Sequence, residues 1–225
     1  MASARPHPAV LFDVDGTLVD SAYIHALAWR RAFVDHGYEV PTAWVHAMIG
    51  AGSDVLMKEL IGEERDDVQD TRKRHFEELK GEIRPFERCA DLIRAVHGAG
   101  AKAFLATSSE KENLDALLEA IDADDAIDGH VSAGDVEHAK PEPDVFVAAL
   151  EKAGADTTSA IAVGDTVWDI KAAADAGLKC VCVLTGGIGR LELEEAGAVA
   201  VYRDVADLLD HLDESPLGPI IRQAG

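Results

Sequence analysis

The chain has 225 residues, which suffices for one core domain with a smaller insertion. Its 42 acidic residues outnumber its 21 basic residues, so the formal net charge is -21 at pH 7. A surface this acidic repels nucleic acids and anionic membranes, which argues against both as partners. A phosphate ligand would therefore depend on a local positive site. Solubility and a salt-rich habitat are both open explanations for the acid excess.

The cysteines and the N-terminus bear on the compartment. Cys89, Cys180 and Cys182 are odd in number and lack the spacing of a disulfide framework, so we expect buried thiols. The N-terminal segment has no apolar stretch suited to a signal peptide, and no run reaches membrane-spanning length. We therefore expect a soluble cytoplasmic protein, present as a monomer or a homodimer.

Short apolar runs alternate with amphipathic stretches along most of the chain. Strands are predicted for residues 8–14, 102–107, 129–133, 160–165, 179–184 and 198–202, and helices for 87–99, 110–120, 142–153, 167–176 and 204–213. This alternation is typical of parallel strands joined by right-handed crossovers. The predicted fold class is α/β, with a Rossmann-like parallel sheet as its core.

Residues 20–84 interrupt this alternation. They show helical periodicity and no strand pattern, and Pro85 closes the region. The simplest interpretation is an all-helical domain inserted into a core that consists of residues 1–19 and 85–225. The tail after residue 213 contains Pro216, Gly218 and Pro219, so we predict that it is irregular.

The segment DVDG carries the first candidate site residues. An apolar run leads directly into Asp13 and Asp15, which places both at the carboxyl end of a predicted strand. Ligands of open α/β sheets bind beyond this end of the strands. The i, i+2 spacing can direct both carboxylates into one site, where they repel each other unless a cation lies between them. We therefore expect a divalent cation with oxygen ligands, Mg²⁺.

A second acidic pair, Asp165 and Asp169, follows the apolar run AIAVG. If a helix begins near Thr166, Asp169 lies in its first turn, and both carboxylates can face the same crevice as Asp13. Helix capping would explain either residue singly. It does not explain why an apolar strand runs into Asp13, so all four carboxylates are candidates for a metal site.

Two further segments offer groups that suit a phosphate. Thr107 and Ser108 end a predicted strand, and hydroxyl and backbone N–H groups at the start of a helix bind phosphate oxygens. For this segment alone, a plain helix cap is the simpler explanation. Lys140 precedes Pro141, which makes its backbone stiff and extended, so that its ammonium group is presented rigidly to a phosphate.

Together, DVDGT, the Thr-Ser pair, Lys-Pro and GDTVWD resemble the haloacid dehalogenase superfamily in order and interval, over about residues 9–213. The resemblance implies that Asp13 is a nucleophile that forms an aspartyl-phosphate. It implies that Asp15 is the general acid for the leaving group and then the base for water. Lys140 would neutralise the charge of the nucleophile and the phosphate.

The same resemblance implies a metal site and a cap. The implied Mg²⁺ ligands are Asp13, the backbone carbonyl of Asp15, and Asp165, with Asp169 as a further or outer carboxylate. Thr107 and the backbone amide of Ser108 would bind the phosphate. Residues 20–84 would form a helical cap that closes over the site, excludes water and selects the substrate.

Asp15 favours phosphoryl chemistry within the superfamily. Dehalogenases need no acid for their leaving group, and phosphonatases replace this carboxylate. We therefore predict a phosphatase for a small phosphorylated metabolite, with phosphoglycolate, hexose or hexitol phosphates and nucleoside monophosphates all open. A non-catalytic binding protein is the alternative from another class, but it would not need to retain Asp13, Asp15, Lys140 and Asp165 together.

A sugar phosphomutase is the closer alternative. DSAYIHALAW resembles the first cap helix of β-phosphoglucomutase, in which a histidine at the place of His25 helps to hold the acid/base aspartate. A half-buried helix histidine is the other explanation. The mutase pattern then has an arginine for a distal phosphate, and Ser53 stands in its place here, which favours hydrolysis. The basic cluster at residues 72–75 is predicted to be a solvated helix face, with a contact to an anionic substrate as the alternative.

Overall fold

The computed structural model describes residues 6–109 and 111–224. In these ranges, six parallel strands form a sheet in the order β5–β4–β1–β6–β7–β8. The strands are β1 (Ala9–Phe12), β4 (Lys102–Ala106), β5 (Gly129–Val131), β6 (Ala160–Gly164), β7 (Cys180–Val183) and β8 (Ala200–Tyr202). Each lies within the run that predicted it, and the α/β class with a parallel core is confirmed.

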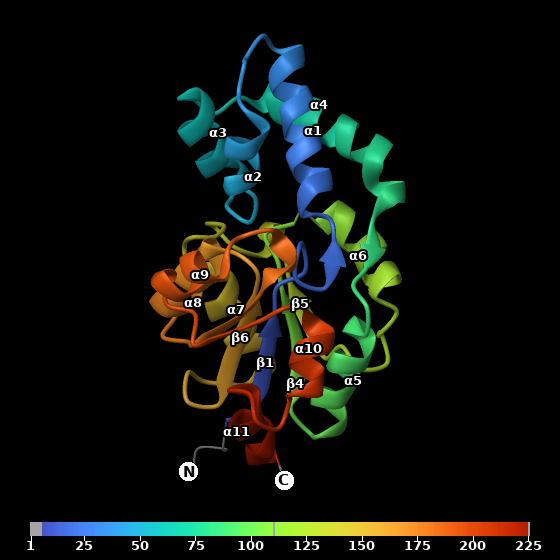
Figure 1. Cartoon of the computed structure of the whole chain (residues 1–225), viewed down its shortest axis with the longest axis vertical. Helices are drawn as coiled ribbons and strands as arrows, with labels where there is room; N and C mark the ends of the chain where they lie inside the picture. Colours follow the sequence, from blue (N-terminus) through green and yellow to red (C-terminus); the bar gives the residue numbers. More distant parts are fainter. Residues whose placement is uncertain (1–5, 110, 225) are drawn as a thin grey trace.

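Helices cover both faces of the sheet (Figure 1). On one face lie α5 (Cys89–Gly98), α6 (Lys111–Ile121), α10 (Val205–Asp210) and α11 (Leu217–Ile221), and on the other α7 (Asp144–Ala153), α8 (Val167–Asp175) and α9 (Arg190–Ala196). In β1, Val10 and Phe12 pack into the first apolar cluster, while Ala9 and Leu11 pack into the second. Burial on both faces explains why this strand is apolar throughout.

The order of the strands reverses beside β1. The chain passes from β1 to β4 and β5 on one side, and then to β6, β7 and β8 on the other. In open α/β sheets, ligands bind in the crevice outside the carboxyl ends of the strands at such a reversal. The residues that follow β1, β4 and β6 therefore meet at one crevice.

The inserted segment lies beyond the carboxyl ends of these strands (Figure 1). It contains α1 (Ala22–Asp35), α2 (Thr42–Ala47), α3 (Ser53–Ile61) and α4 (Asp66–Leu79), which bury an apolar cluster of their own around Trp29 and Phe33. An antiparallel ribbon of β2 (Val19–Asp20) and β3 (Arg84–Pro85) joins the segment to the rest of the chain. The prediction of no strand was wrong at residues 20 and 84, because strands of two residues are too short to show a period.

The C-terminal part contains two helices that the sequence did not predict, α9 and α11. The prediction of an irregular tail was wrong. Pro216 caps α11 and Pro219 lies in its first turn, where backbone N–H groups have no partner within a helix. Leu217 and Ile221 are buried against the sheet, so packing stabilises this short helix.

The longest helices in the described part of the chain, α1 and α4, have 14 residues each. A helix needs about 20 apolar residues to cross the hydrocarbon core of a bilayer. Within the described residues, no helix meets the length and the apolar character that a membrane span requires.

Candidate active site

The structure brings the predicted residues to one crevice. Asp13 follows β1, Thr107 follows β4 and Asp165 follows β6, and these strands are neighbours in the sheet. Oxygen atoms of Asp13, Asp165 and Asp169 lie within 4.8 Å of one another, and all three residues are buried. Lys140 comes from the segment before α7 and reaches the same crevice.

Lys140 pairs with two of these carboxylates. Its Nζ donates to Asp13 Oδ1 at 2.5 Å, to Asp169 Oδ1 at 2.7 Å and to the carbonyl oxygen of Ala106 at 3.0 Å. Burial alone would lower the pKa of this fully buried lysine, but the two carboxylates outweigh burial and raise it. Lys140 is therefore a fixed positive charge beside Asp13.

Burial dominates the titration of Asp13. It raises the pKa of Asp13 to about 7, against the opposing effect of Lys140, and the carboxylates of Asp169 and Asp15 add to the rise. Without a further positive charge, burial therefore disfavours the ionised form of this carboxyl group. A cation at the site would favour its ionised form.

Asp165 has an oxygen that accepts no hydrogen bond from the residues that the structure describes. Thr17 Oγ1 donates to Asp165 Oδ1 at 2.7 Å, while Oδ2 is buried and accepts no hydrogen bond. Burial raises the pKa of Asp165 well above its ordinary value, and the charges of Asp169 and Asp13 raise it further. Gly186 leaves room for this carboxylate, since a side-chain carbon there would collide with Oδ2.

These observations fit a divalent cation with oxygen ligands. A buried carboxylate oxygen without a partner is costly unless a cation or water meets it. Asp169 differs from Asp165, because both of its oxygens already accept hydrogen bonds. Oδ1 accepts from Lys140, and Oδ2 accepts from Thr166 in the capping box that begins α8. Asp169 therefore caps α8 and also lies beside the candidate metal site. Because both of its oxygens are already occupied, it suits a position outside the direct ligands of the cation.

Asp15 is surrounded by donors. Its carboxylate accepts from Ser109 Oγ at 2.5 Å, Ser21 Oγ at 2.6 Å and His25 Nε2 at 2.9 Å. Thr107 Oγ1 lies 3.4 Å from Asp15 Oδ2. Burial would raise the pKa of Asp15, but His25 and the hydroxyl donors outweigh it and lower the pKa. Ser21 and Ser109 were not predicted for this role, although Ser21 and His25 are four residues apart and therefore share a helix face.

Arg72 lies in an environment different from the one predicted for it. It was predicted to lie on a solvated helix face, but it is 8% exposed and donates from Nη2 to His25 Nδ1 at 3.0 Å. Its guanidinium carbon lies 5.5 Å from the ring centre of Trp29 and 5.3 Å from that of Phe76. The buried Val68 and Phe76 at i-4 and i+4 were the available signal, because they place Arg72 on the buried face of α4.

The hydrogen bond from Arg72 determines how His25 is protonated. A guanidinium group only donates, so His25 Nδ1 must accept and Nε2 carries the proton. Nε2–H then donates to Asp15 Oδ1. His25 also stacks on Phe76, with ring centres 4.4 Å apart. Arg72, His25 and Asp15 thus form a chain of donors that runs from α4 through α1 to the end of β1.

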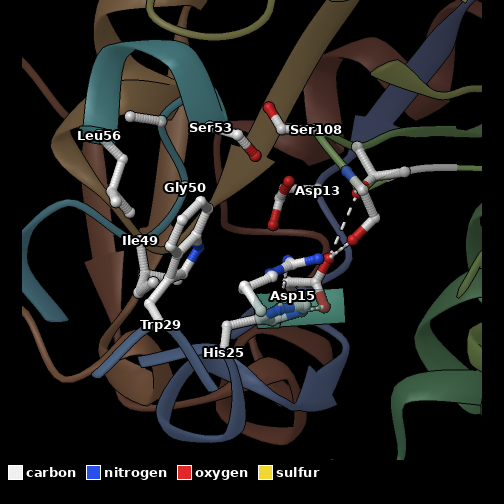
Figure 2. A pocket seen from close by; sticks show the side chains of 13 residues that line it. Asp13, Asp15, His25, Trp29, Ile49, Gly50, Ser53, Leu56 and Ser108 are labelled. Atoms are coloured by element: carbon white, nitrogen blue, oxygen red, sulfur yellow. Dashed lines mark hydrogen bonds and ion pairs between the residues drawn. The ribbon is translucent and has the colours of Figure 1, made fainter. Parts of the chain in front are cut away.

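A pocket lies between the inserted helices and the sheet (Figure 2). Ser53 at the start of α3 points toward Asp13, and Ser108 lies nearby (Figure 2). Ser108 Oγ is buried and has no hydrogen-bond partner among the described residues. The lining residues are Asp13, Asp15, His25, Trp29, Ile49, Gly50, Ala51, Ser53, Leu56, Arg72, Thr107, Ser108 and Ser109. The structure thus places the predicted substrate residues His25, Ser53, Thr107 and Ser108 at one pocket.

Asparagine substitutions at Asp15 and Asp165 are expected to change the stability of the metal-free protein in opposite directions. The pKa of Asp15 is lowered from 3.8, so its ionised form stabilises the fold above pH 4. Asp15→Asn should lower the free energy of unfolding at pH 8 by about 1–3 kcal/mol. The pKa of Asp165 is raised, so stability is lost as the pH rises through it, and Asp165→Asn should raise the free energy of unfolding at pH 8.

Urea denaturation at pH 8 in EDTA measures both changes. Asp175→Asn alters an exposed carboxylate on α8 and serves as the control, with an expected change within about 0.5 kcal/mol. The stabilisation by Asp165→Asn should shrink as the pH falls toward 4, because wild-type Asp165 becomes protonated. Destabilisation of the metal-free protein by Asp165→Asn would show that this carboxylate is not under repulsion.

Known proteins are similar to this chain in sequence. It is 32% identical over 239 residues to protein CbbY (plasmid) of Cupriavidus necator, covering 96% of this chain and 92% of that protein. It is 29% identical over 232 residues to phosphoglycolate phosphatase of Escherichia coli K12, covering 90% of this chain and 91% of that protein. It also matches the much longer SUPPRESSOR OF QUENCHING 1 protein of Arabidopsis thaliana at 28% identity, where 89% of this chain spans 20% of that protein.

The fold and the family agree with these relatives. The crystal structure of a hydrolase from Pseudomonas syringae superimposes with a TM-score of 0.87 at 33% identity, over 92% of this chain and 98% of that one. The sequence profile of the haloacid dehalogenase-like hydrolase family matches residues 10–183, which is more than half of the chain. The chain belongs to the haloacid dehalogenase-like hydrolases.

Proposed function

We propose that this hydrolase is a Mg²⁺-dependent phosphatase that acts on a small phosphorylated metabolite through an aspartyl-phosphate on Asp13. The observation that carries the proposal is the position of Asp13. One of its oxygens accepts from the buried Lys140, and its carboxyl group borders a pocket that also contains Asp15. A nucleophile, a neutralising cation and a proton donor are thereby within one small site. Relatives named phosphoglycolate phosphatase support phosphatase chemistry.

In the proposed reaction, an oxygen of Asp13 attacks phosphorus and the ester bond to the alcohol breaks. Protonated Asp15 gives its proton to the leaving oxygen. As a carboxylate, Asp15 then takes a proton from the water that attacks the aspartyl-phosphate, which releases phosphate and restores Asp13. His25 and the hydroxyl donors favour the carboxylate form of Asp15 before substrate binds. A phosphate dianion beside it raises its pKa again, because a nearby like charge disfavours ionisation.

Asp13, Asp165 and the backbone carbonyl of Asp15 would hold the Mg²⁺ ion, with Asp169 behind them. When bound, the ion would neutralise the carboxylates and the phosphate oxygens and so reduce the repulsion between nucleophile and substrate. Thr107 and Ser108 would bind the remaining phosphate oxygens, while Lys140, whose donors already reach Asp13, Asp169 and Ala106, would neutralise the charge of the nucleophile and the phosphate. The buried Oδ2 of Asp165 and the buried Oγ of Ser108, neither of which has a partner in the protein, support these two assignments.

We also propose that residues 20–84 act as a cap over this site and that the structure corresponds to a closed arrangement. Three hydrogen bonds support the proposal, each between the inserted segment and a residue at or beside the catalytic loops. They run between His46 Nε2 and the carbonyl of Gly186 (2.8 Å), from Trp168 Nε1 to the carbonyl of Ala47 (3.2 Å), and from the Gly52 amide to the carbonyl of Lys140 (2.8 Å). Closure would exclude water from the pocket.

Asp13→Asn should lower phosphate release from p-nitrophenyl phosphate by about a thousandfold or more, since an amide is a poor nucleophile of nearly the same shape. Circular dichroism should show an unchanged fold. Asp124→Asn, at an exposed position, is the matched control and should retain full activity. Appreciable turnover by folded Asp13→Asn would refute the nucleophile, and absence of turnover in the wild type would favour a non-catalytic binding protein.

Removal of Mg²⁺ by EDTA should abolish turnover, and added Mg²⁺ should restore it. Isothermal titration calorimetry should show Mg²⁺ binding to the wild type and binding at least about tenfold weaker to Asp165→Asn, because a carboxylate is a far better ligand than an amide. Mg²⁺ binding of equal strength in both proteins would contradict the proposed role of Asp165, whatever the activity.

A sugar phosphomutase is the second candidate, favoured by the contact between His25 and Asp15. A mutase must hold a distal phosphate, which in the mutase pattern is done by an arginine where this chain has Ser53. Lys58 is exposed, and Arg72, which lines the pocket, already donates to His25. A hydroxyl lacks the charged hydrogen bonds of an arginine, each of which contributes about 1.5–3 kcal/mol.

β-Glucose 1-phosphate, given with Mg²⁺ and a trace of the 1,6-bisphosphate, should therefore yield inorganic phosphate or no product. A coupled assay with glucose-6-phosphate dehydrogenase, run beside a phosphate-release assay, separates the two activities. Rapid formation of glucose 6-phosphate without release of phosphate would establish the mutase and exclude the hydrolase for this substrate.

A further inference from the structure

Among the described residues, the charges of the site would balance with a divalent cation bound. Within the described residues, the pocket and the adjoining metal cluster contain four carboxylates, from Asp13, Asp15, Asp165 and Asp169, and two permanent cations, from Lys140 and Arg72. A divalent cation brings their sum to zero. A phosphate dianion then leaves one or two negative charges among largely buried groups, according to whether Asp15 is protonated. A second anionic group on the substrate would add to this repulsion unless the cap offered it a cation.

The cap side of the pocket offers little positive charge. Among the described residues that line it, Arg72 and His25 are the groups that can be cationic. His25 accepts a hydrogen bond at Nδ1, which requires the neutral ring. The rest of this wall consists of apolar side chains, glycine and one hydroxyl, from Trp29, Ile49, Gly50, Ala51, Ser53 and Leu56 (Figure 2).

Arg72 is committed to another task. Its Nη2 donates to His25, and its guanidinium group packs against the rings of Trp29 and Phe76. It is connected to the carboxylate of Asp15 through His25, which donates to Asp15. A substrate carboxylate that drew Arg72 away would remove the donor that fixes the proton of His25, and would thereby disturb Asp15.

One polar group remains for the organic part of a substrate, and it is a hydroxyl. Ser53 lies at the start of α3 and points toward Asp13 (Figure 2). The hydroxyl of Ser108 is assigned above to the phosphate oxygens, which leaves the hydroxyl of Ser53 for the rest of the substrate. A serine hydroxyl can donate to and accept from an alcohol, whereas a neutral hydroxyl does little to offset a carboxylate charge. Trp29, Ile49 and Leu56 can cover the C–H surface of such an alcohol.

On the basis of the phosphatase function proposed above, we infer that the substrate is a phosphate monoester of an uncharged, hydroxyl-bearing alcohol, and that Ser53 is a specificity-determining residue. Ser53 contributes a neutral hydrogen-bonding group at the position opposite Asp13 where a cation would be needed to accept a second anion. Substrates with a carboxylate or a second phosphate near the ester are disfavoured.

Two matched pairs of substrates test this inference. 2-Hydroxyethyl phosphate and phosphoglycolate differ only by a CH₂OH group in place of a carboxylate, and glycerol 3-phosphate and 3-phosphoglycerate differ in the same way. Phosphate release with Mg²⁺ should give kcat/KM at least about tenfold higher for the alcohol of each pair, because like charges in a closed site repel. Equal values, or higher values for the carboxylates, would overturn the inference.

Variants of Ser53 separate charge from size. Ser53→Arg should lower the alcohol-to-carboxylate ratio by about tenfold or more, because it supplies the missing cation. Ser53→Gln has a long neutral side chain and should leave the ratio near that of the wild type. Ala43→Arg adds the same charge at an exposed position of α2, outside the pocket, and should not change the ratio. A ratio that responds equally to Ser53→Arg and Ala43→Arg would refute the role of Ser53.

Hydrolysis of p-nitrophenyl phosphate distinguishes the two levels of the proposal. If the wild type releases no phosphate from it with Mg²⁺, the phosphatase function fails, and the inference about the substrate falls with it. If it does, but neither member of a pair is hydrolysed, competitive inhibition constants replace kcat/KM. The alcohols should then inhibit at least about tenfold more strongly, and equal or absent inhibition by both members would overturn the inference.

Discussion

The buried ammonium group of Lys140 is the interaction on which the site depends. It joins Asp13 at the end of β1 to Asp169 in the first turn of α8. A buried cation is strongly disfavoured without partners, and the same holds for each carboxylate. Loss of Lys140 would leave two buried carboxylates without their shared cation. The segment before α7, the end of β1 and the start of α8 are therefore held in one arrangement by charge as well as by packing.

A second constraint connects the inserted helices to this arrangement. Arg72 on α4 fixes the protonation of His25 on α1, and His25 lowers the pKa of Asp15. Asp15 would lose this donor if the helices moved away from the sheet, and its affinity for a proton would rise. The position of the inserted segment and the protonation of Asp15 are thus linked, so a substrate that closes the pocket also acts on the group that we propose for proton transfer.

The sequence predicted the core and the charged centre better than the connections around them. Strands buried on both faces produce continuous apolar runs, so their order along the chain was visible. Asp13 and Asp165 follow two of these runs, which made them candidates for one crevice at the carboxyl ends of the strands. The ribbon of β2 and β3 and the short α11 have too few residues for a period, and their stability comes from packing. Arg72 looked like one member of a solvated cluster, because its burial depends on the packing of α4 against α1, which follows from tertiary structure.

The acidic residues of the site do not contribute alike to the fold. Asp15 is surrounded by donors and its ionised form stabilises the protein, whereas Asp165 is buried beside other carboxylates with one oxygen that no protein group meets. The repulsion at Asp165 does not serve packing, and we expect an amide there to be more stable in the metal-free protein. A bound cation would relieve this repulsion, so carboxylates that weaken the metal-free fold would strengthen a metal site. A site of this kind retains its carboxylates because the bound state needs them.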